Sequence, residues 1–269
     1  MGKELNRLSK RKKLLSQLDD IFENDKTSLV LHYSCESFYD KTDGKTPRIT
    51  SIAVRNLDSG QTDSFSIHQI AEENHVEFEN ITDKYDSLER EMLDRYFQFL
   101  NTHQHYIWIH WNMRDVNYGF QAIEHRYRAL GGTPISLNED RKFDLSRALV
   151  SLYGVGYIGH PRLPKLLEIN NITCKDFLTG EEEAQAFDDK DFVELHRSTL
   201  RKVDNLANII ERTYNQKLKT NSTWLEQHGF SLAVLLEIIK GHPVVILLTL
   251  LVLVMAFIEK SYNVFNLFK

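Results

Sequence analysis

Cysteine is scarce in this sequence, and that scarcity limits how the fold can be held together. The chain has 269 residues and two cysteines, Cys35 and Cys174, and neither belongs to a Cys-x-x-Cys pair or to a cysteine–histidine cluster. Structural zinc sites and disulfide frameworks both require several closely spaced cysteines. The sequence therefore predicts neither, and two reduced thiols are typical of a protein that stays in the cytoplasm.

An excess of positive charge is also missing. The chain carries 33 Lys and Arg against 38 Asp and Glu, which gives a formal net charge of −5. This balance excludes a strong attraction of the whole molecule to nucleic acid, so any anion-binding surface has to be local. Internal repeats and low-complexity segments are absent from the sequence, and its apolar content of 42% suits one main core.

The N-terminal region, residues 1–27, lacks the apolar run that would make it a secretory signal. It is rich in basic side chains instead: Lys3, Arg7, Lys10, Arg11, Lys12 and Lys13. Leucines at helical spacing accompany them, so we expect a basic amphipathic helix. Its charged face is either simply solvated or a patch for anionic lipid or nucleic acid, and the sequence leaves both interpretations open.

Charge is absent altogether from residues 243–258, which read PVVILLTLLVLVMAFI. As a helix this segment extends about 24 Å, slightly less than a hydrocarbon core of ~30 Å, and it has further apolar and aromatic neighbours. We predict a single-pass transmembrane helix at 243–258, after a juxtamembrane segment at 221–242 and before a short tail at 259–269. This layout resembles that of tail-anchored proteins, which implies a soluble domain on the cytoplasmic side.

The predicted transmembrane helix contains no ionisable residue, so a single copy cannot line an ion path. Its expected partner is the lipid bilayer, and the helix could also bind a protein partner or a second copy of itself.

The order of strands and helices in residues 28–220 predicts one α/β domain. Apolar or alternating runs predict strands at 28–34, 48–56, 62–67 and 106–110. Amphipathic patterns predict helices at 86–101, 117–130, 163–169 and 181–219, the last with a break near 188–189, and residues 142–151 combine a short strand with a helix. We expect a mixed sheet in which the first three strands are antiparallel and residues 106–110 run parallel to the first strand.

Acidic residues and histidines stand at the ends of two of these strands and on the late helix. They are Glu36 in the sequence SCE at 34–36, His110 and Asp115 in HWNMRD at 110–115, and His196 and Asp204 in HRSTLRKVD at 196–204. Their order and spacing resemble the motifs of the DEDD family of 3′–5′ exonucleases, and the resemblance extends over residues 28–214. It implies an RNase H-like fold, flanked by helices, in which carboxylates hold two Mg²⁺ ions that activate a water for attack on a phosphodiester.

This resemblance implies specific roles for residues of this chain. Glu36, Asp115 and Asp204 would be catalytic carboxylates that bind Mg²⁺ or Mn²⁺, because hard cations take oxygen ligands. His196 would be a catalytic general base. The residues expected to contact nucleic acid are His110, Arg114, Arg201 and Lys202.

The chain departs from the family at two of its motifs. Ser34 stands where the family has its first aspartate, and a hydroxyl is a weaker Mg²⁺ ligand than a carboxylate. The third motif requires a histidine and an aspartate five positions apart, but His196 and Asp204 are eight positions apart. We therefore expect a catalytically degenerate, membrane-anchored module that senses or binds a nucleic acid, a nucleotide or a protein partner.

Two alternatives remain open. One is an active metal-dependent 3′–5′ exonuclease that is tethered to the membrane, and the other is a membrane-perturbing effector that the soluble domain controls. Coupling of a sensor domain to a membrane helix suggests, by analogy of architecture alone, a role in bacterial antiphage defence.

Overall fold

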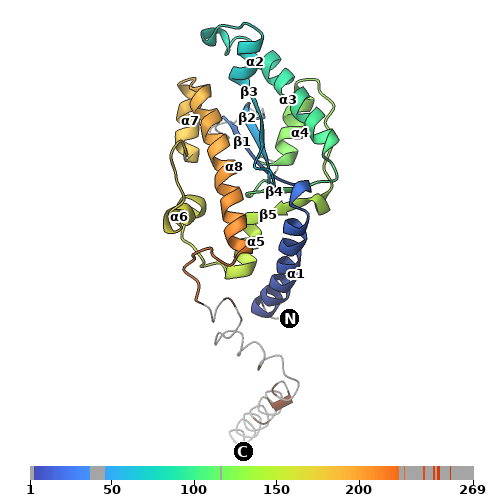
Figure 1. The fold of residues 1–269 in the computed structure, drawn as a ribbon, viewed down its shortest axis with the longest axis vertical. Helices are drawn as coiled ribbons and strands as arrows, with labels where there is room; N and C mark the ends of the chain where they lie inside the picture. The colour runs from blue at the N-terminus through green and yellow to red at the C-terminus, as the bar shows by residue number, and fades with distance from the viewer. Residues whose placement is uncertain are drawn as a thin grey trace, which may run out of the picture.

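The computed structural model describes residues 3–36, 46–115 and 117–223, and beyond them the single positions 227, 239, 245, 247, 248 and 255. The continuous ranges form a mixed five-stranded sheet with helices on both of its faces (Figure 1). The strands are β1 (Ser28–Cys35), β2 (Ile49–Asn56), β3 (Thr62–Ser66), β4 (Ile107–His110) and β5 (Lys142–Asp144). The α-helices are α1 (Lys3–Glu23), α2 (Ile67–Glu73), α3 (Tyr85–Thr102), α4 (Phe120–Ala129), α5 (Leu145–Tyr153), α6 (Arg162–Ile169), α7 (Gly180–Asp188) and α8 (Phe192–Tyr214).

The strand order in the sheet is β3-β2-β1-β4-β5. Strand β2 is antiparallel to both β1 and β3, so these three consecutive strands form a meander. Strand β4 is parallel to β1, with Leu29 opposite Trp108, and β5 is parallel to β4. The mixed α/β sheet, its antiparallel first three strands and the parallel pairing of the 106–110 strand with the first strand are thus confirmed.

The central strand β1 is buried on both faces, which explains its nearly continuous apolar sequence. Leu31 and Tyr33 face a core cluster that includes α2, α3 and α4, whereas Val30 faces a second cluster built with α1, α5, α6 and α8. Leu18 of α1 is buried in that second cluster. The basic helix expected in residues 1–27 therefore packs against the same folded body as the rest of the domain.

The parallel direction of β1, β4 and β5 brings their carboxyl ends to one edge of the sheet. Helix α8 crosses the sheet so that Thr199 lies at this edge, next to Ser34 and Ser51, while Asp204 lies beside Arg55 farther toward the opposite edge. Thr199 and Asp204 of α8 thus lie over different parts of the sheet.

No helix among the described residues is long and apolar enough to cross a membrane. The transmembrane helix predicted at 243–258 and the tail at 259–269 lie outside the described residues, apart from the isolated positions named above.

Candidate functional site

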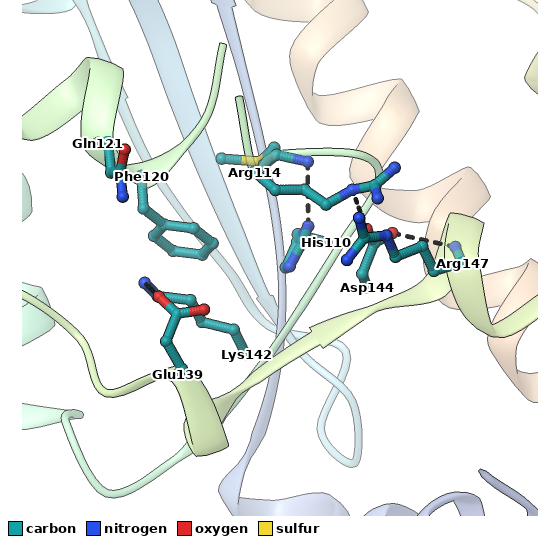
Figure 2. A pocket seen from close by; sticks show the side chains of 9 residues that line it. His110, Arg114, Phe120, Gln121, Glu139, Lys142, Asp144 and Arg147 are labelled. Atoms are coloured by element: carbon teal, nitrogen blue, oxygen red, sulfur yellow. Dashed lines mark hydrogen bonds and ion pairs between the residues drawn. The ribbon is translucent and has the colours of Figure 1, made fainter. Parts of the chain in front are cut away.

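A cavity of about 260 Å³ opens at the carboxyl ends of β4 and β5 (Figure 2). It is lined by His110, Met113, Arg114, Phe120, Gln121, Glu139, Lys142, Asp144 and Arg147. The two strands contribute His110, Lys142 and Asp144, and the starts of α4 and α5 contribute Phe120, Gln121 and Arg147. In open sheets with parallel strands, the carboxyl edge is where ligands generally bind, which makes this cavity the first candidate for a functional site.

His110 is a neutral hydrogen-bond donor at the centre of this cavity. Its ring is 3% exposed and packs edge-on against Phe120, with 5.4 Å between ring centroids. Burial lowers the pKa of His110 to about 4, and the charges of Lys142 and Arg114 act in the same direction. The backbone N–H of Met113 donates to Nδ1 at 3.1 Å. Since Nδ1 accepts that bond in a neutral ring, the proton is on Nε2, which can donate to a ligand.

Asp144 ties the loop after β4 to the start of α5. Its Oδ2 lies 2.6 Å from Nε of Arg114. Its Oδ1 accepts from the backbone N–H of Arg147 at 3.2 Å as the N-cap of α5, and from the N–H of Asn112 at 3.4 Å. Figure 2 shows Arg114 and Arg147 on the same side of the cavity, beside Asp144. One carboxylate therefore holds the side chain of Arg114 and the backbone of Arg147.

The charge of the lining is slightly positive. Lys142 pairs with Glu139, with 2.5 Å between Nζ and Oε1, and its Nζ lies 5.0 Å from the centre of the Phe120 ring. Arg114 is compensated by Asp144. Arg147 is exposed, and its side chain forms no ion pair with any residue that the structure describes. One uncompensated cation and the neutral donor on His110 make the cavity suited to a small anion.

Two of the predicted metal ligands lie near this edge of the sheet. Glu36 follows β1 and is buried, and its Oε1 accepts a hydrogen bond from the backbone N–H of Arg48. Asp115 follows β4 and is exposed, and its Oδ1 accepts from the backbone N–H of Asn117 at 2.8 Å. Both carboxylates thus already accept a hydrogen bond from the chain around them.

Asp204, the third predicted ligand, lies elsewhere. It pairs with Arg55 at 3.1 Å and lies 4.0 Å from Arg201. Arg55 is opposite Val30 in the β1–β2 register. Six residues of strand, about 20 Å, separate Val30 from Glu36. The structure therefore does not bring the three predicted carboxylates together.

The position of the missing first aspartate is occupied by an internal polar network. Ser34 Oγ lies 2.7 Å from both Glu183 Oε1 and Thr199 Oγ1, and Ser51 Oγ lies 2.5 Å from Thr199 Oγ1. Lys202 Nζ lies 2.7 Å from the same Glu183 oxygen. Where the resemblance places metal-binding carboxylates, the network has one carboxylate, and it is paired with an ammonium group and bonded to a hydroxyl.

This donor set does not fit a pair of divalent ions, since a lysine ammonium is not a metal ligand and hard cations need several oxygen donors. In the part of the chain that the structure describes, no three or more His, Cys, Asp or Glu side chains form a group that could hold a metal ion. Binding of Mg²⁺ or Mn²⁺ by Glu36, Asp115 and Asp204 stays a prediction.

The remaining predicted residues also lie away from the cavity. His196 is buried beside Ser64, with 3.4 Å between Nε2 and Oγ, and its ring centroid is 5.1 Å from that of His68. Burial lowers the pKa of His196 to about 4. Arg201 donates from Nε to the backbone oxygen of Lys175 at 2.8 Å. Of the residues predicted to contact nucleic acid, the structure places His110 and Arg114 in the cavity but not Arg201 and Lys202.

Four charged residues of the cavity and one of the network were not predicted as site residues from the sequence: Glu139, Lys142, Asp144, Arg147 and Glu183. Asp144 had a detectable signal, because an aspartate between a short strand and a helix is a favoured N-cap. Once Asp144 is recognised as an N-cap, Lys142 and Arg147 can be placed near it, because they belong to the same strand–helix unit. Glu183 had no such signal, because it is one of three consecutive glutamates at the start of α7.

Comparison of the chain with protein-family models, with curated proteins and with solved structures finds no match.

Proposed function

We propose that this chain is a membrane-anchored, RNase H-like domain that binds the phosphate-bearing end of a nucleotide or nucleic acid without hydrolysing it. The observation that carries the proposal is the cavity in which His110, Arg114 and Arg147 converge at the carboxyl ends of β4 and β5. The strand order, with one antiparallel strand between β1 and β3, supports the RNase H-like assignment.

The chemistry of the cavity favours a phosphate group. Arginine guanidinium groups match phosphate oxygens in geometry and charge. The Nε2–H of His110 adds a neutral donor, and the Arg114–Asp144 pair is already formed before a ligand arrives. The volume of about 260 Å³ is slightly below the ~300–1,000 Å³ typical of pockets for drug-sized ligands, which favours a terminal phosphate with part of one nucleotide.

The network around Ser34 supports binding without hydrolysis. Two-metal hydrolysis needs carboxylates that hold the ions about 4 Å apart. Here the carboxylate nearest to Ser34 belongs to Glu183, and Lys202 neutralises it. This arrangement supports binding as the function, as expected for a degenerate member of an exonuclease-like group.

A binding assay with a matched control tests the proposal. Fluorescence anisotropy of short labelled oligonucleotides and calorimetry with nucleoside monophosphates would be measured for the wild type, Arg147→Gln and Arg197→Gln. Arg147 lines the cavity, whereas Arg197 is equally exposed but lies on α8. Loss of one charge-assisted contact should weaken binding about tenfold in Arg147→Gln alone. Equal affinities for all three proteins, or no binding by the wild type, would refute the proposed site.

The membrane part of the proposal rests on residues 243–258. Three described side chains of this segment, Leu247, Leu248 and Met255, are 59%, 56% and 61% exposed. Large exposed apolar side chains in an uncharged run support burial in lipid. Deletion of residues 243–269 should release the chain from alkaline-washed membranes. Retention of the shortened chain would place the anchor elsewhere.

A further inference from the structure

The N-terminal half of α1 is an unusually concentrated basic surface. Between residues 6 and 18 the helix has five cationic side chains and no acidic one. Lys10, Lys12 and Lys13 are exposed, and they form no ion pair with any part of the chain that the structure describes. Leu14 and Leu18 of the same helix pack against the core, and the lysines lie on the surface that this packing leaves exposed. The three lysines therefore present their charge outward.

Helix stability does not explain this concentration of charge. Arg7 is three residues from Lys10 and four from Arg11, and Lys10 is three residues from Lys13. Like charges at these spacings destabilise a helix, because the side chains are neighbours on its surface. Burial, and in addition the charge of Arg7, lowers the pKa of Arg11. A negatively charged surface outside the chain would compensate this repulsion.

The basic half of α1 lies next to the point where the chain leaves the domain. Arg7 Nη1 donates to the backbone oxygen of Ser151 at 3.5 Å, near the end of α5. Ser222 Oγ donates to the backbone oxygen of Tyr153 at 2.6 Å, at the same end of α5. In Figure 1 the N-terminal end of α1 and the coil that follows α8 both lie at the lower end of the domain.

We infer that Lys10, Lys12 and Lys13 of α1 form a second membrane contact that rests on the anionic phospholipid headgroups of the bilayer. The inference rests on the proposed anchoring by residues 243–258. Only twenty positions separate residue 223 from residue 243, so the proposed anchor keeps this surface at a high effective concentration beside the headgroups. A single anchored end leaves the domain free to rotate, and a basic contact beside the exit point would set its orientation.

An anionic bilayer is favoured over a nucleic acid because the anchor keeps it permanently within reach. None of the described residues of α1 lines the cavity at β4 and β5. A terminal phosphate can therefore occupy the cavity without contacting the α1 surface. Charge attraction acts only within a Debye length, about 8–10 Å at physiological salt, so proximity to the headgroups is essential.

Lysine reactivity in the full-length chain tests this contact. The chain would be mixed with vesicles of phosphatidylcholine alone or of phosphatidylcholine with phosphatidylglycerol, and floated. A brief pulse of an amine-acetylating reagent would then be read at each lysine by mass spectrometry. Lys190 is the internal control, because it is exposed and precedes α8 at the end away from α1.

We expect Lys10, Lys12 and Lys13 to react about fivefold more slowly on anionic than on neutral vesicles, with Lys190 unchanged and high salt removing the difference. Equal reactivity on both vesicles would overturn the inference. Protection by an oligonucleotide on neutral vesicles, without protection by anionic lipid, would also overturn it. Flotation of the protein with neutral vesicles tests the proposed anchor at residues 243–258 separately. If the protein floats with anionic vesicles alone, the result contradicts the anchor and supports the basic contact. If it floats with neither kind of vesicle, the result contradicts both.

Discussion

The buried ion pair between Glu183 and Lys202 should behave as one energetic unit. The side chains are 12% and 6% exposed, with 2.7 Å between Oε1 and Nζ. Removing one partner leaves the other as an uncompensated buried charge, which typically costs about 3–5 kcal/mol. We therefore expect Glu183→Gln and Lys202→Met each to lower the free energy of unfolding by roughly 3 kcal/mol or more. The double variant should lose less than either single one, because neither charge is then left alone.

Urea unfolding of the detergent-solubilised full chain, followed by the fluorescence of the buried Trp108, would measure these four proteins. Lys190→Met serves as the control, since an exposed lysine without a partner should change stability by no more than about 0.5 kcal/mol. Additive losses in the double variant would show that the two charges do not stabilise one another. That result would refute the assignment of Lys202 as the internal cation of the network around Ser34.

Three further predictions concern the loop, the histidines and the metal. Gly119→Ala should destabilise the protein by about 1–3 kcal/mol and weaken ligand binding, because the added Cβ would lie 2.6 Å from a backbone carbonyl. Gly156→Ala is the control, since its Cβ would meet open space, and a thermal-shift assay should find it neutral. Burial in the folded protein holds the pKa of His110 and of His196 at about 4, below the ordinary value of 6.5. As the pH falls, these histidines therefore become protonated in the unfolded chain before they do so in the folded one. Stability should fall by up to about 3 kcal/mol per histidine as pH falls from 6.5 to 4, and a pH series of urea unfolding should show a shallower fall for His196→Gln. Calorimetry should find negligible Mn²⁺ binding by the wild type and stronger binding by Ser34→Asp, which adds a carboxylate beside an existing one; tight binding by the wild type would restore the metal hypothesis.

The sheet was predictable from sequence because local patterns determine it. The apolar run of β1 and the alternation in β2 identify strands without knowledge of their neighbours. The short apolar strand β4 follows a helix, and that order predicts a crossover and therefore parallel pairing with β1.

The site was predictable only in part, because its geometry depends on packing between distant elements. His110 and Arg114 were identified through the resemblance of residues 110–115 to an exonuclease motif, which begins at the end of an apolar strand. The position of Asp204 depends on where α8 crosses the sheet, which the periodicity of the helix does not determine. Strand β5 has three residues, too few for a pattern that identifies its neighbour in the sheet. The position of Lys142 in the cavity therefore became known only from the pairing of β5 with β4.

The fate of a bound oligonucleotide separates binding from hydrolysis most directly. A labelled oligonucleotide would be incubated with excess protein and Mg²⁺ or Mn²⁺, read by anisotropy, and then separated by length on a denaturing gel. We predict that the wild type binds the oligonucleotide and returns it at full length, while Arg147→Gln binds it about tenfold more weakly. A ladder of products shortened from the 3′ end, lost in Glu36→Gln, would contradict this account and identify an active exonuclease.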